Sequence, residues 1–281
     1  MTWPIDFPVV ALQAPDGASA HIALYGAQVL QWRSADGLER LYVSEQAVWD
    51  GSASIRGGVP VCWPQFNQRG PLAKHGFARR VHWAVTEQAA ERVVLRLTPA
   101  QVPPTWTHDA QGQCLWPYTY ELLLTVALQP NALHIQLDVH NTGDSTMPFT
   151  TALHSYLACD AVEQLQITGA EGLQYWDAVA GANPSHPMQA GPITFCGEVD
   201  RVYPAFTATL QEPQRSLRVE ASASMGDTVV WNPGAALAAT LSDIPLGGWR
   251  RYVCVEAAQL SQAVALPSGA HWSASQTLHA V

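Results

Sequence analysis

Positive charge is scarce in this sequence of 281 residues, which holds 14 Lys and Arg against 23 Asp and Glu. The formal net charge at pH 7 is therefore −9. An acidic chain of this kind is repelled by the phosphates of nucleic acid and by acidic membrane surfaces. We therefore expect neither nucleic acid nor a membrane as a partner, and we expect a small-molecule ligand instead.

Cysteine pairs and long apolar runs are also missing. Five cysteines without paired spacing indicate free thiols in a reducing compartment and no zinc site; they are Cys62, Cys114, Cys159, Cys196 and Cys254. The start of the chain, MTWPIDFPVV, has no basic segment before an apolar run, and no stretch is long enough to span a bilayer. These absences predict a cytoplasmic protein.

Helical periodicity is equally rare, because few windows keep apolar residues at helical spacing for more than two turns. Short alternating or β-branched runs are frequent instead; they are residues 20–24, 29–32, 41–43, 81–86, 93–97, 118–128 and 133–139. Two hairpins are predicted, one turning at Pro130-Asn131 and one formed by residues 207–213 and 215–222. The pattern predicts an all-β fold, a large antiparallel β-sandwich in one domain over residues 1–281.

Two longer segments interrupt the strand pattern. Residues 99–117 contain Pro103-Pro104 and Trp106, and residues 176–196 are rich in Gly, Ala and Pro. Both predict surface loops, and neither resembles a linker between domains.

The positive charge that the chain does have is concentrated between Ile55 and Arg80. This segment, IRGGVPVCWPQFNQRGPLAKHGFARR, contains Arg56, Arg69, Lys74, Arg79 and Arg80. Glycines permit tight turns, and Gly57-Gly58 is expected to let the backbone approach a ligand closely. Arg holds a phosphate through paired donors and Lys holds it as a point charge. The segment therefore predicts a site for a small anion, with a solvated basic loop as the alternative.

His154 lies in the run MPFTTALHSYLAC, which predicts a strand. On a two-residue period it shares a face with Thr150, Ala152 and Tyr156, while more apolar residues point the other way. We expect His154 to face a lined cavity, where an imidazole can act as an acid or a base near neutral pH. A structural histidine is the alternative.

Two carboxylates are further candidates. Glu256 ends the run RRYVCVEAAQL and shares a face with Tyr252 and Cys254. Burial there would raise its pKa and suit a general base, whereas a strand-end glutamate turned to water is the alternative. Asp200, in CGEVDRVYPAF, is a weaker candidate because Arg201 beside it is a possible ion-pair partner.

His75 and Arg79 are four residues apart and share one face of an extended segment, whereas Lys74 faces away unless the backbone turns at Gly76. Four tryptophans lie in loop-like contexts where a ring can stack on a sugar; they are Trp63, Trp176, Trp231 and Trp249. Most tryptophans serve the core, so none is assigned to a ligand.

Seven sequence blocks together resemble a known family. They are IRGGVPVCWPQF, LAKHGFAR, FTTALHSYL, VDRVY, VVWNP, YVCVE and PSGAHWSASQTL, in this order between residues 55 and 278. In this order they resemble the hexose-6-phosphate mutarotases, also called glucose-6-phosphate 1-epimerases, of the aldose 1-epimerase superfamily. The resemblance implies a β-sandwich of the galactose mutarotase type that interconverts the anomers of a hexose 6-phosphate without cofactor or metal. We expect the protein to be a monomer.

The resemblance also implies roles for seven residues. His154 would be the general acid that protonates the ring oxygen, and Glu256 the base at the anomeric hydroxyl. His75 and Asp200 would hold sugar hydroxyls. The phosphate would be held by Arg56, Lys74 and Arg79. Because a neutral imidazole gives up its proton poorly, we expect His154 to be largely protonated when it acts.

The sequence departs from the family pattern at two places. Lys74 stands where the family usually has Gln, and Gly234 and Leu237 stand where many relatives have Trp and Lys. Three other functions stay open. One is a mutarotase for unphosphorylated aldoses, one is a glycoside hydrolase that uses Asp200 and Glu256, and one is a non-catalytic sugar-phosphate-binding protein.

Overall fold

The computed structural model describes residues 3–179 and 186–281. Its regular structure is almost entirely antiparallel strand, arranged in three sheets, so the all-β prediction is confirmed. The largest sheet has eight strands in the order β11-β14-β15-β18-β8-β7-β6-β5. These strands are β5 (Ala84–Gln88), β6 (Arg92–Leu97), β7 (Tyr120–Gln129), β8 (Ala132–Asn141), β11 (Gln166–Thr168), β14 (Ala208–Glu212), β15 (Arg215–Ala221) and β18 (His271–Ala280).

A second sheet of seven strands packs against the first. Its order is β12-β13-β16-β17-β9-β4, with β10 also paired to β17. The strands are β4 (Val61–Cys62), β9 (Met147–Leu153), β10 (Tyr156–Ala158), β12 (Trp176–Asp177), β13 (Val199–Pro204), β16 (Asp227–Asn232) and β17 (Tyr252–Leu266). Val253 and Val255 of β17 join the main core with β7 and β8, so Cys254 and Glu256 point to the outer face.

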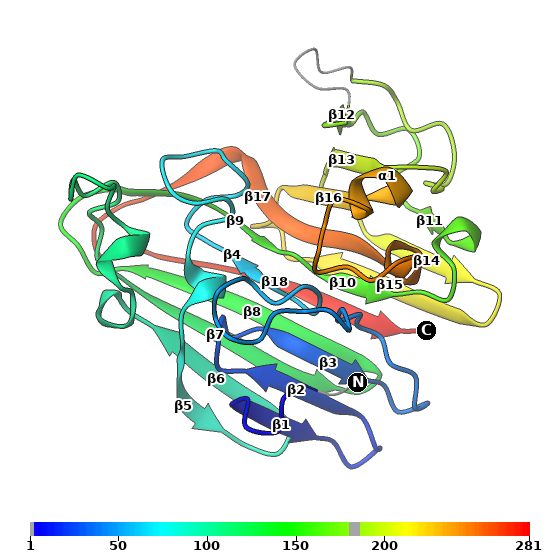
Figure 1. The fold of residues 1–281 in the computed structure, drawn as a ribbon, viewed down its shortest axis with the longest axis horizontal. Coiled ribbons are helices and arrows are strands. Elements are labelled where there is room, and N and C mark those ends of the chain that lie inside the picture. Colours follow the sequence, from blue (N-terminus) through cyan, green and yellow to red (C-terminus); the bar gives the residue numbers. More distant parts are fainter. Residues whose placement is uncertain (1–2, 180–185) are drawn as a thin grey trace.

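A small third sheet is formed by β1 (Val9–Gln13), β2 (Ser19–Ala23) and β3 (Val29–Arg33). In Figure 1 it lies at the lower edge of the view, in dark blue. Gln28, which immediately precedes β3, is fully buried, and its side-chain amide donates to the carbonyls of Ile55 (3.1 Å) and Gly57 (2.6 Å). Gln28, immediately before the small sheet's last strand, therefore fixes the backbone on both sides of Arg56.

Among residues 3–179 and 186–281, helical structure is limited to short segments. They are α1 (Gly234–Ala238) and the 3-10 turns η1 (Ala78–Arg80), η2 (Pro99–Gln101), η3 (Pro104–Trp106), η4 (Val162–Gln164) and η5 (Gly248–Arg251). Within the described residues, no helix has the length and apolar character needed to cross a membrane.

Both predicted hairpins are present, as β7 with β8 and β14 with β15. Two predicted strands differ from the structure. Residues 41–43 make only isolated bridges, Leu41 to Leu157 and Val43 to Gly57. In the run 81–86 the strand begins at Ala84, and His82 makes an isolated bridge to Tyr25. The loop at 99–117 is confirmed, with two 3-10 turns and no strand. In the predicted loop 176–196 the first two residues form β12, and residues 180–185 lie outside the described part.

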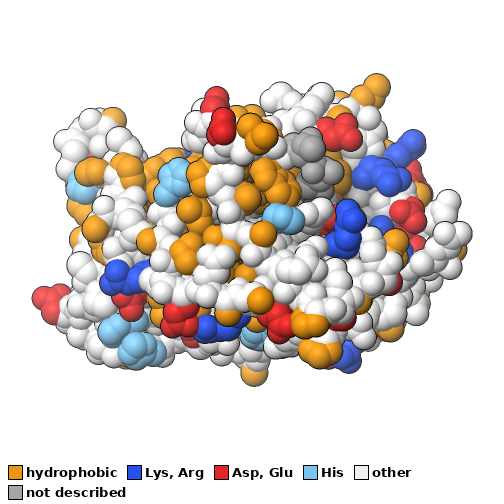
Figure 2. Space-filling model, turned by 90° about the horizontal axis from the view of Figure 1, so that it is seen from below, with side chains coloured by type: hydrophobic (Ala, Val, Ile, Leu, Met, Phe, Trp, Pro, Cys, Tyr) orange, Lys and Arg blue, Asp and Glu red, His pale blue; other side chains and the backbone are white. Residues whose placement is uncertain are grey.

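The five cysteines are free, as predicted. On the face shown in Figure 2, Lys and Arg side chains occur in small separate groups among Asp and Glu. That face presents no broad basic surface, which agrees with a chain whose positive charge is sparse.

Gly57 and Gly58 correct one expectation. Both have positive φ, and a Cβ on Gly57 would lie 2.3 Å from the Tyr42 carbonyl oxygen, while one on Gly58 would lie 2.1 Å from the Val29 carbonyl oxygen. The two glycines therefore serve close packing of the backbone against neighbouring strands, not the approach of a ligand. Their effect is to seat the residue before them, Arg56, next to the small sheet.

Candidate active site

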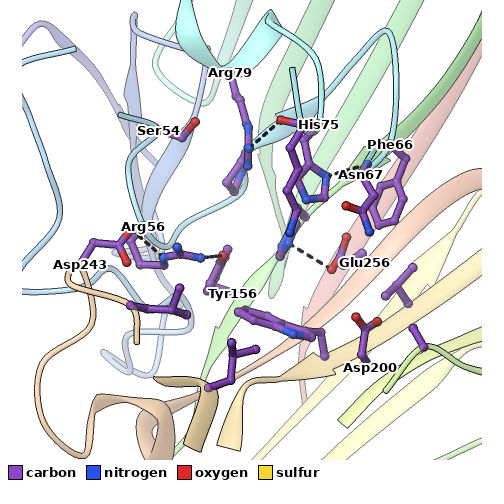
Figure 3. A pocket seen from close by; sticks show the side chains of 18 of the residues that line it. Ser54, Arg56, Phe66, Asn67, His75, Arg79, Tyr156, Asp200, Asp243 and Glu256 are labelled. Atoms are coloured by element: carbon purple, nitrogen blue, oxygen red, sulfur yellow. Dashed lines mark hydrogen bonds and ion pairs between the residues drawn. The ribbon is translucent and has the colours of Figure 1, made fainter. Parts of the chain in front are cut away.

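A cavity of about 490 Å³ lies on the outer face of the seven-stranded sheet. Its walls come from residues 53–80, from β10, β13, β16 and β17, and from residues 237–243 at and after α1. All seven residues singled out from the sequence line it; they are Arg56, Lys74, His75, Arg79, His154, Asp200 and Glu256. The fold thus brings the separate sequence motifs to one place (Figure 3).

His154 and Glu256 meet at the centre of the cavity because of strand register. β17 pairs Cys254 with Tyr156 and Ala257 with Leu153, which leaves Glu256 opposite His154. The Glu256 Oε1 lies 3.3 Å from the His154 Nε2, and both side chains are almost completely buried. His154 is not within a strand as expected, since β9 ends at Leu153 and residues 154–155 form the break before β10.

The surroundings of this pair disfavour charge on either partner. Burial, followed by the positive charges of Arg79 and Arg56, lowers the pKa of His154 well below its ordinary value. Burial, followed by the charge of Asp200, raises the pKa of Glu256 well above its ordinary value. The protonated His154 expected from the sequence is therefore not favoured by the protein alone. Both shifts act in the same sense, toward a neutral imidazole on His154 and a neutral carboxyl on Glu256.

His75 is fixed as a neutral hydrogen-bond donor. Its Nδ1 accepts the backbone N–H of Asn67 at 3.2 Å, so its proton resides on Nε2. Burial and the nearby charge of Arg79 lower the pKa of His75, which keeps the ring uncharged. The residue has φ +66°, and the next residue, Gly76, has φ +68°. A Cβ on Gly76 would lie 2.1 Å from the Trp63 carbonyl oxygen, so the turn that presents His75 requires this glycine.

One end of the cavity is cationic. Arg56 and Arg79 lie there (Figure 3), and Lys74, the only lysine of the whole chain, also lines the cavity and acts on Asp200 as well. The Arg56 Nε donates to the Asp243 Oδ2 (3.0 Å) and its Nη1 donates to the Tyr156 hydroxyl oxygen (3.0 Å). Burial alone would lower the pKa of Arg56, but these two partners raise it, so the guanidinium stays charged.

The other two arginines of the same segment, Arg69 and Arg80, also line the cavity, but each is bonded to a neighbouring loop. Arg69 donates to the Leu260 carbonyl and lies 4.7 Å over the ring of Trp176. Arg80 donates to the Ser52 carbonyl and lies 4.6 Å over the ring of Trp106. All five basic residues of the segment therefore line the cavity, and Arg69 and Arg80 also tie loops together.

The opposite end is carboxylate-rich. Asp200, on β13, points into the cavity beside Glu198, while its neighbour Arg201 turns away to lie over Tyr175. Arg201 is therefore not the ion-pair partner considered from the sequence. Burial, followed by the charge of Glu198, raises the pKa of Asp200 to about 6.

Sequence reasoning did not single out several polar wall residues, among them Tyr156, Asp243 and Glu198, and it assigned none of the four tryptophans to a ligand. Tyr156 and Asp243 line the cavity, but Asp243 is linked to Arg56 only through the folded chain, and Tyr156 was noted only as sharing a face with His154. Trp176 and Trp231 do line the cavity, from strands β12 and β16. Trp63 is fully buried in the core, and Trp249 packs against it, so these two are not sugar platforms.

Within residues 3–179 and 186–281, no group of three or more His, Cys, Asp or Glu is arranged to hold a metal ion. The site does contain proton donors and acceptors in His75, His154, Asp200 and Glu256. A buried His–carboxylate pair can move protons at one position while cations hold an anion at another.

Comparison with known proteins defines the class. The family model for "Aldose 1-epimerase" matches residues 8–279. The chain belongs to the aldose 1-epimerase family, and its sandwich is of the galactose mutarotase type. An epimerase that acts on sugars is the activity of this class.

Individual relatives are more specific. A protein of Cenchrus ciliaris named "Putative glucose-6-phosphate 1-epimerase" is 31% identical over 99% of this chain and 86% of its own length. A protein of Escherichia coli (strain K12) with the same name is 31% identical over 86% of this chain and 80% of its own length. The crystal structure of "a putative mutarotase" from Salmonella typhimurium superposes with a TM-score of 0.83 and 26% identity, covering 99% of this chain and 92% of that one.

Proposed function

We propose that the protein interconverts the α and β anomers of a hexose 6-phosphate, with glucose 6-phosphate as the first candidate. The observation that supports this most directly is the shared cavity of a buried His154–Glu256 pair and a cationic end of Arg56, Arg79 and Lys74. A neutral sugar has no use for three cations, whereas a phosphorylated one needs both features.

The chemistry requires only proton transfers. The Glu256 carboxylate takes the proton of the anomeric hydroxyl while His154 delivers a proton to the ring oxygen, and the bond between C1 and the ring oxygen breaks. Rotation about the C1–C2 bond followed by reclosure gives the other anomer, and the protons return to where they started. Each transfer typically contributes ~10²- to 10⁴-fold, and no cofactor is needed for any step.

The substrate's phosphate is proposed to activate the pair as well as hold the sugar. Arg56, Arg79 and Lys74 carry three positive charges and Asp243 one negative charge, so the cationic end has a formal charge of +2. A phosphate dianion cancels this charge. Of these cations, Arg56 lowers the pKa of His154 but is not among the causes that act on Glu256, so neutralising Arg56 favours the transfer of a proton from Glu256 to His154, which creates the acid and the base together. Binding of the substrate's phosphate thereby sets the protonation state of the His154–Glu256 pair.

His75 and Asp200 are proposed to orient the sugar ring. The Nε2–H of His75 donates to a hydroxyl, because its Nδ1 is already occupied by the backbone of Asn67. The Asp200 carboxylate accepts from hydroxyls at the other end of the ring. Figure 3 shows His75 on one side of Glu256 and Asp200 on the other.

The other functions make different demands on the same residues. A glycoside hydrolase needs two carboxyl groups across the scissile bond. Its mechanism does not use a direct contact between His154 and Glu256. A mutarotase for free aldoses has no use for the cationic end, because its substrate carries no anionic group. A binding protein without turnover has no need for a buried His–Glu pair, which is costly to fold.

The deciding experiment starts from anomerically pure glucose 6-phosphate, dissolved immediately before use. Exchange NMR then measures the approach to anomeric equilibrium with and without the protein, with glucose and galactose run in parallel. We expect strong acceleration for the phosphorylated sugar and much weaker acceleration for the other two. Equal acceleration of all three sugars supports the free-aldose function instead, and no acceleration of any hexose 6-phosphate refutes the proposal.

Cytoplasmic location, a monomeric state and a single domain over residues 1–281 remain predictions. Light scattering on the purified protein tests the monomer directly, because a dimer would double the mass of 30.4 kDa.

A further inference from the structure

Tyr156 occupies the junction between the cationic end and the catalytic pair. Its ring is buried and stacks almost parallel on the His154 imidazole, with centroids 4.9 Å apart and planes at 9°. Trp231 and Tyr252 pack against its other sides, at 6.2 Å and 5.2 Å between centroids. This packing restricts rotation of the Tyr156 side chain, so its hydroxyl group is held at one place beside His154.

The hydrogen-bonding state of this hydroxyl is set by Arg56. The Tyr156 oxygen accepts a hydrogen bond from the Arg56 Nη1 at 3.0 Å, which is its one hydrogen bond within the described part of the chain. A guanidinium has no acceptor, so the phenolic hydrogen must point elsewhere. Burial raises the pKa of Tyr156, so the hydrogen is retained. The cavity wall therefore contains a fixed neutral donor with a free hydrogen.

Asp243 determines which side of Arg56 receives an anion. Its carboxylate occupies the Nε edge of the guanidinium at 3.0 Å and repels a second negative group from that edge. The remaining guanidinium hydrogens are those near Tyr156. An anion that binds Arg56 from the cavity therefore lies within reach of the Tyr156 hydroxyl, as the arrangement in Figure 3 illustrates.

We propose that Tyr156 is a substrate-binding residue that donates its hydroxyl hydrogen to an oxygen of the substrate's phosphate group. This inference rests on the proposed function and adds a specificity residue to it. Arg56 supplies charge, Asp243 fixes the direction of approach, and Tyr156 supplies a neutral, directional donor at the point where the phosphate joins the sugar. The phosphate is thereby placed next to the His154 ring without a further cation that would oppose protonation of His154.

The test compares Tyr156→Phe with Tyr252→Phe. The first variant keeps the ring and its stacking on His154 but removes the hydroxyl. The second removes a hydroxyl from the neighbouring ring, whose oxygen has no hydrogen-bond partner among residues 3–179 and 186–281 and which does not line the cavity. KM and kcat are measured for glucose 6-phosphate and glucose, and the Kd for inorganic phosphate is measured by calorimetry.

For Tyr156→Phe we expect KM for glucose 6-phosphate and Kd for phosphate to rise about 10-fold, as fits one hydrogen bond to a charged group, while kcat stays nearly unchanged. The kinetics of glucose and all values for Tyr252→Phe should match the wild type. A structural role alone would alter both sugars together. Equal changes for glucose and glucose 6-phosphate, or none for either, overturn the proposal.

The two proposals fail in different ways. If the wild type does not act on glucose 6-phosphate, the proposed function fails, and the phosphate titration alone then decides the role of Tyr156. Weaker phosphate binding by Tyr156→Phe supports that role, whereas unchanged binding, or no binding by the wild type, overturns it. If the wild type acts on glucose 6-phosphate and Tyr156→Phe behaves like it, only the Tyr156 inference falls.

Discussion

The two ends of the cavity use their charges differently. At the cationic end, Arg56 is already bonded to Asp243 and Tyr156, so its direction is fixed. At the carboxylate end, Asp200 and Glu198 lie side by side, and burial together with this repulsion raises the pKa of Asp200 to about 6. One end is built to hold a fixed positive charge, and the other holds a carboxyl whose charge changes near neutral pH. The His154–Glu256 pair lies between them and responds to both.

The largest effect on kcat is expected for substitutions of His154 and Glu256, which lie between the two ends of the cavity. Glu256→Gln and His154→Ala should each lower kcat about 10²- to 10⁴-fold, for phosphorylated and unphosphorylated sugars alike, because the ring and its anomeric carbon are common to both. Exchange NMR measures the rates. Glu220→Gln, on the opposite sheet, is the matched control. A variant of either residue that retains wild-type kcat would remove the pair from the mechanism.

Loss of the fixed positive charge should affect only the phosphorylated substrate. Arg56→Ala is expected to lower kcat/KM for glucose 6-phosphate about 100-fold, since charged hydrogen bonds to the phosphate are lost, with little change for glucose. Steady-state kinetics on both sugars provide the comparison. Arg218→Ala, on strand β15, controls for the change in net charge. Equal losses on the two sugars would show that Arg56 does not discriminate the phosphate.

The proposed effect of bound phosphate on the His154–Glu256 pair can be tested by supplying the phosphate and the sugar as separate molecules. Inorganic phosphite or phosphate dianion should accelerate the anomerisation of glucose by roughly tenfold, because raising the pKa of His154 by one unit increases its protonated fraction by about that factor. Chloride at equal ionic strength is the control. The effect should disappear in Arg56→Ala. If phosphate inhibits or leaves the glucose rate unchanged, the charge at the cationic end does not govern the pair.

The titration of Asp200, at the carboxylate end, should appear in the pH dependence of kcat/KM. Because the pKa of Asp200 is raised from its ordinary value to about 6, its carboxyl is neutral below that pH and accepts sugar hydroxyls poorly. We therefore expect kcat/KM to fall by a few fold as the pH drops through about 6. The pH profile of Asp200→Asn should lack this limb while remaining lower overall. A limb that persists unchanged in Asp200→Asn belongs to another group.

The smallest effect concerns Lys74. As the only lysine in the chain, it is the sole side-chain amine available to an amine-directed reagent. Glucose 6-phosphate should slow the labelling of Lys74 a few fold, because a bound phosphate shields the ammonium group. Peptide mass spectrometry measures the labelling, with glucose as the control ligand. Equal labelling under both conditions would place the Lys74 amine outside the phosphate site.

The sequence predicted the strands, the sandwich and the seven cavity residues, because alternation reports the faces of strands and the motifs carry the chemistry. It did not predict which groups touch. The contact of His154 with Glu256 depends on the register of β17 against both β9 and β10, and that of Arg56 with Asp243 depends on the path of a loop nearly two hundred positions later. The purpose of Gly57-Gly58 was misjudged for the same reason, since close packing against Tyr42 and Val29 is a tertiary property.

Gln28 links the small sheet to the cavity although no side chain of that sheet lines it. Its amide fixes the carbonyls before and after Arg56, so the reach of this guanidinium is set from outside the cavity. The His154–Glu256 pair is linked to the small sheet less directly, because His154 donates its backbone N–H to the Pro60 carbonyl (3.0 Å) and the preceding residue, Val59, donates to the Val29 carbonyl of β3 (2.8 Å). Preference for a phosphorylated sugar can therefore be altered from outside the cavity, by redesigning the neighbourhood of Gln28.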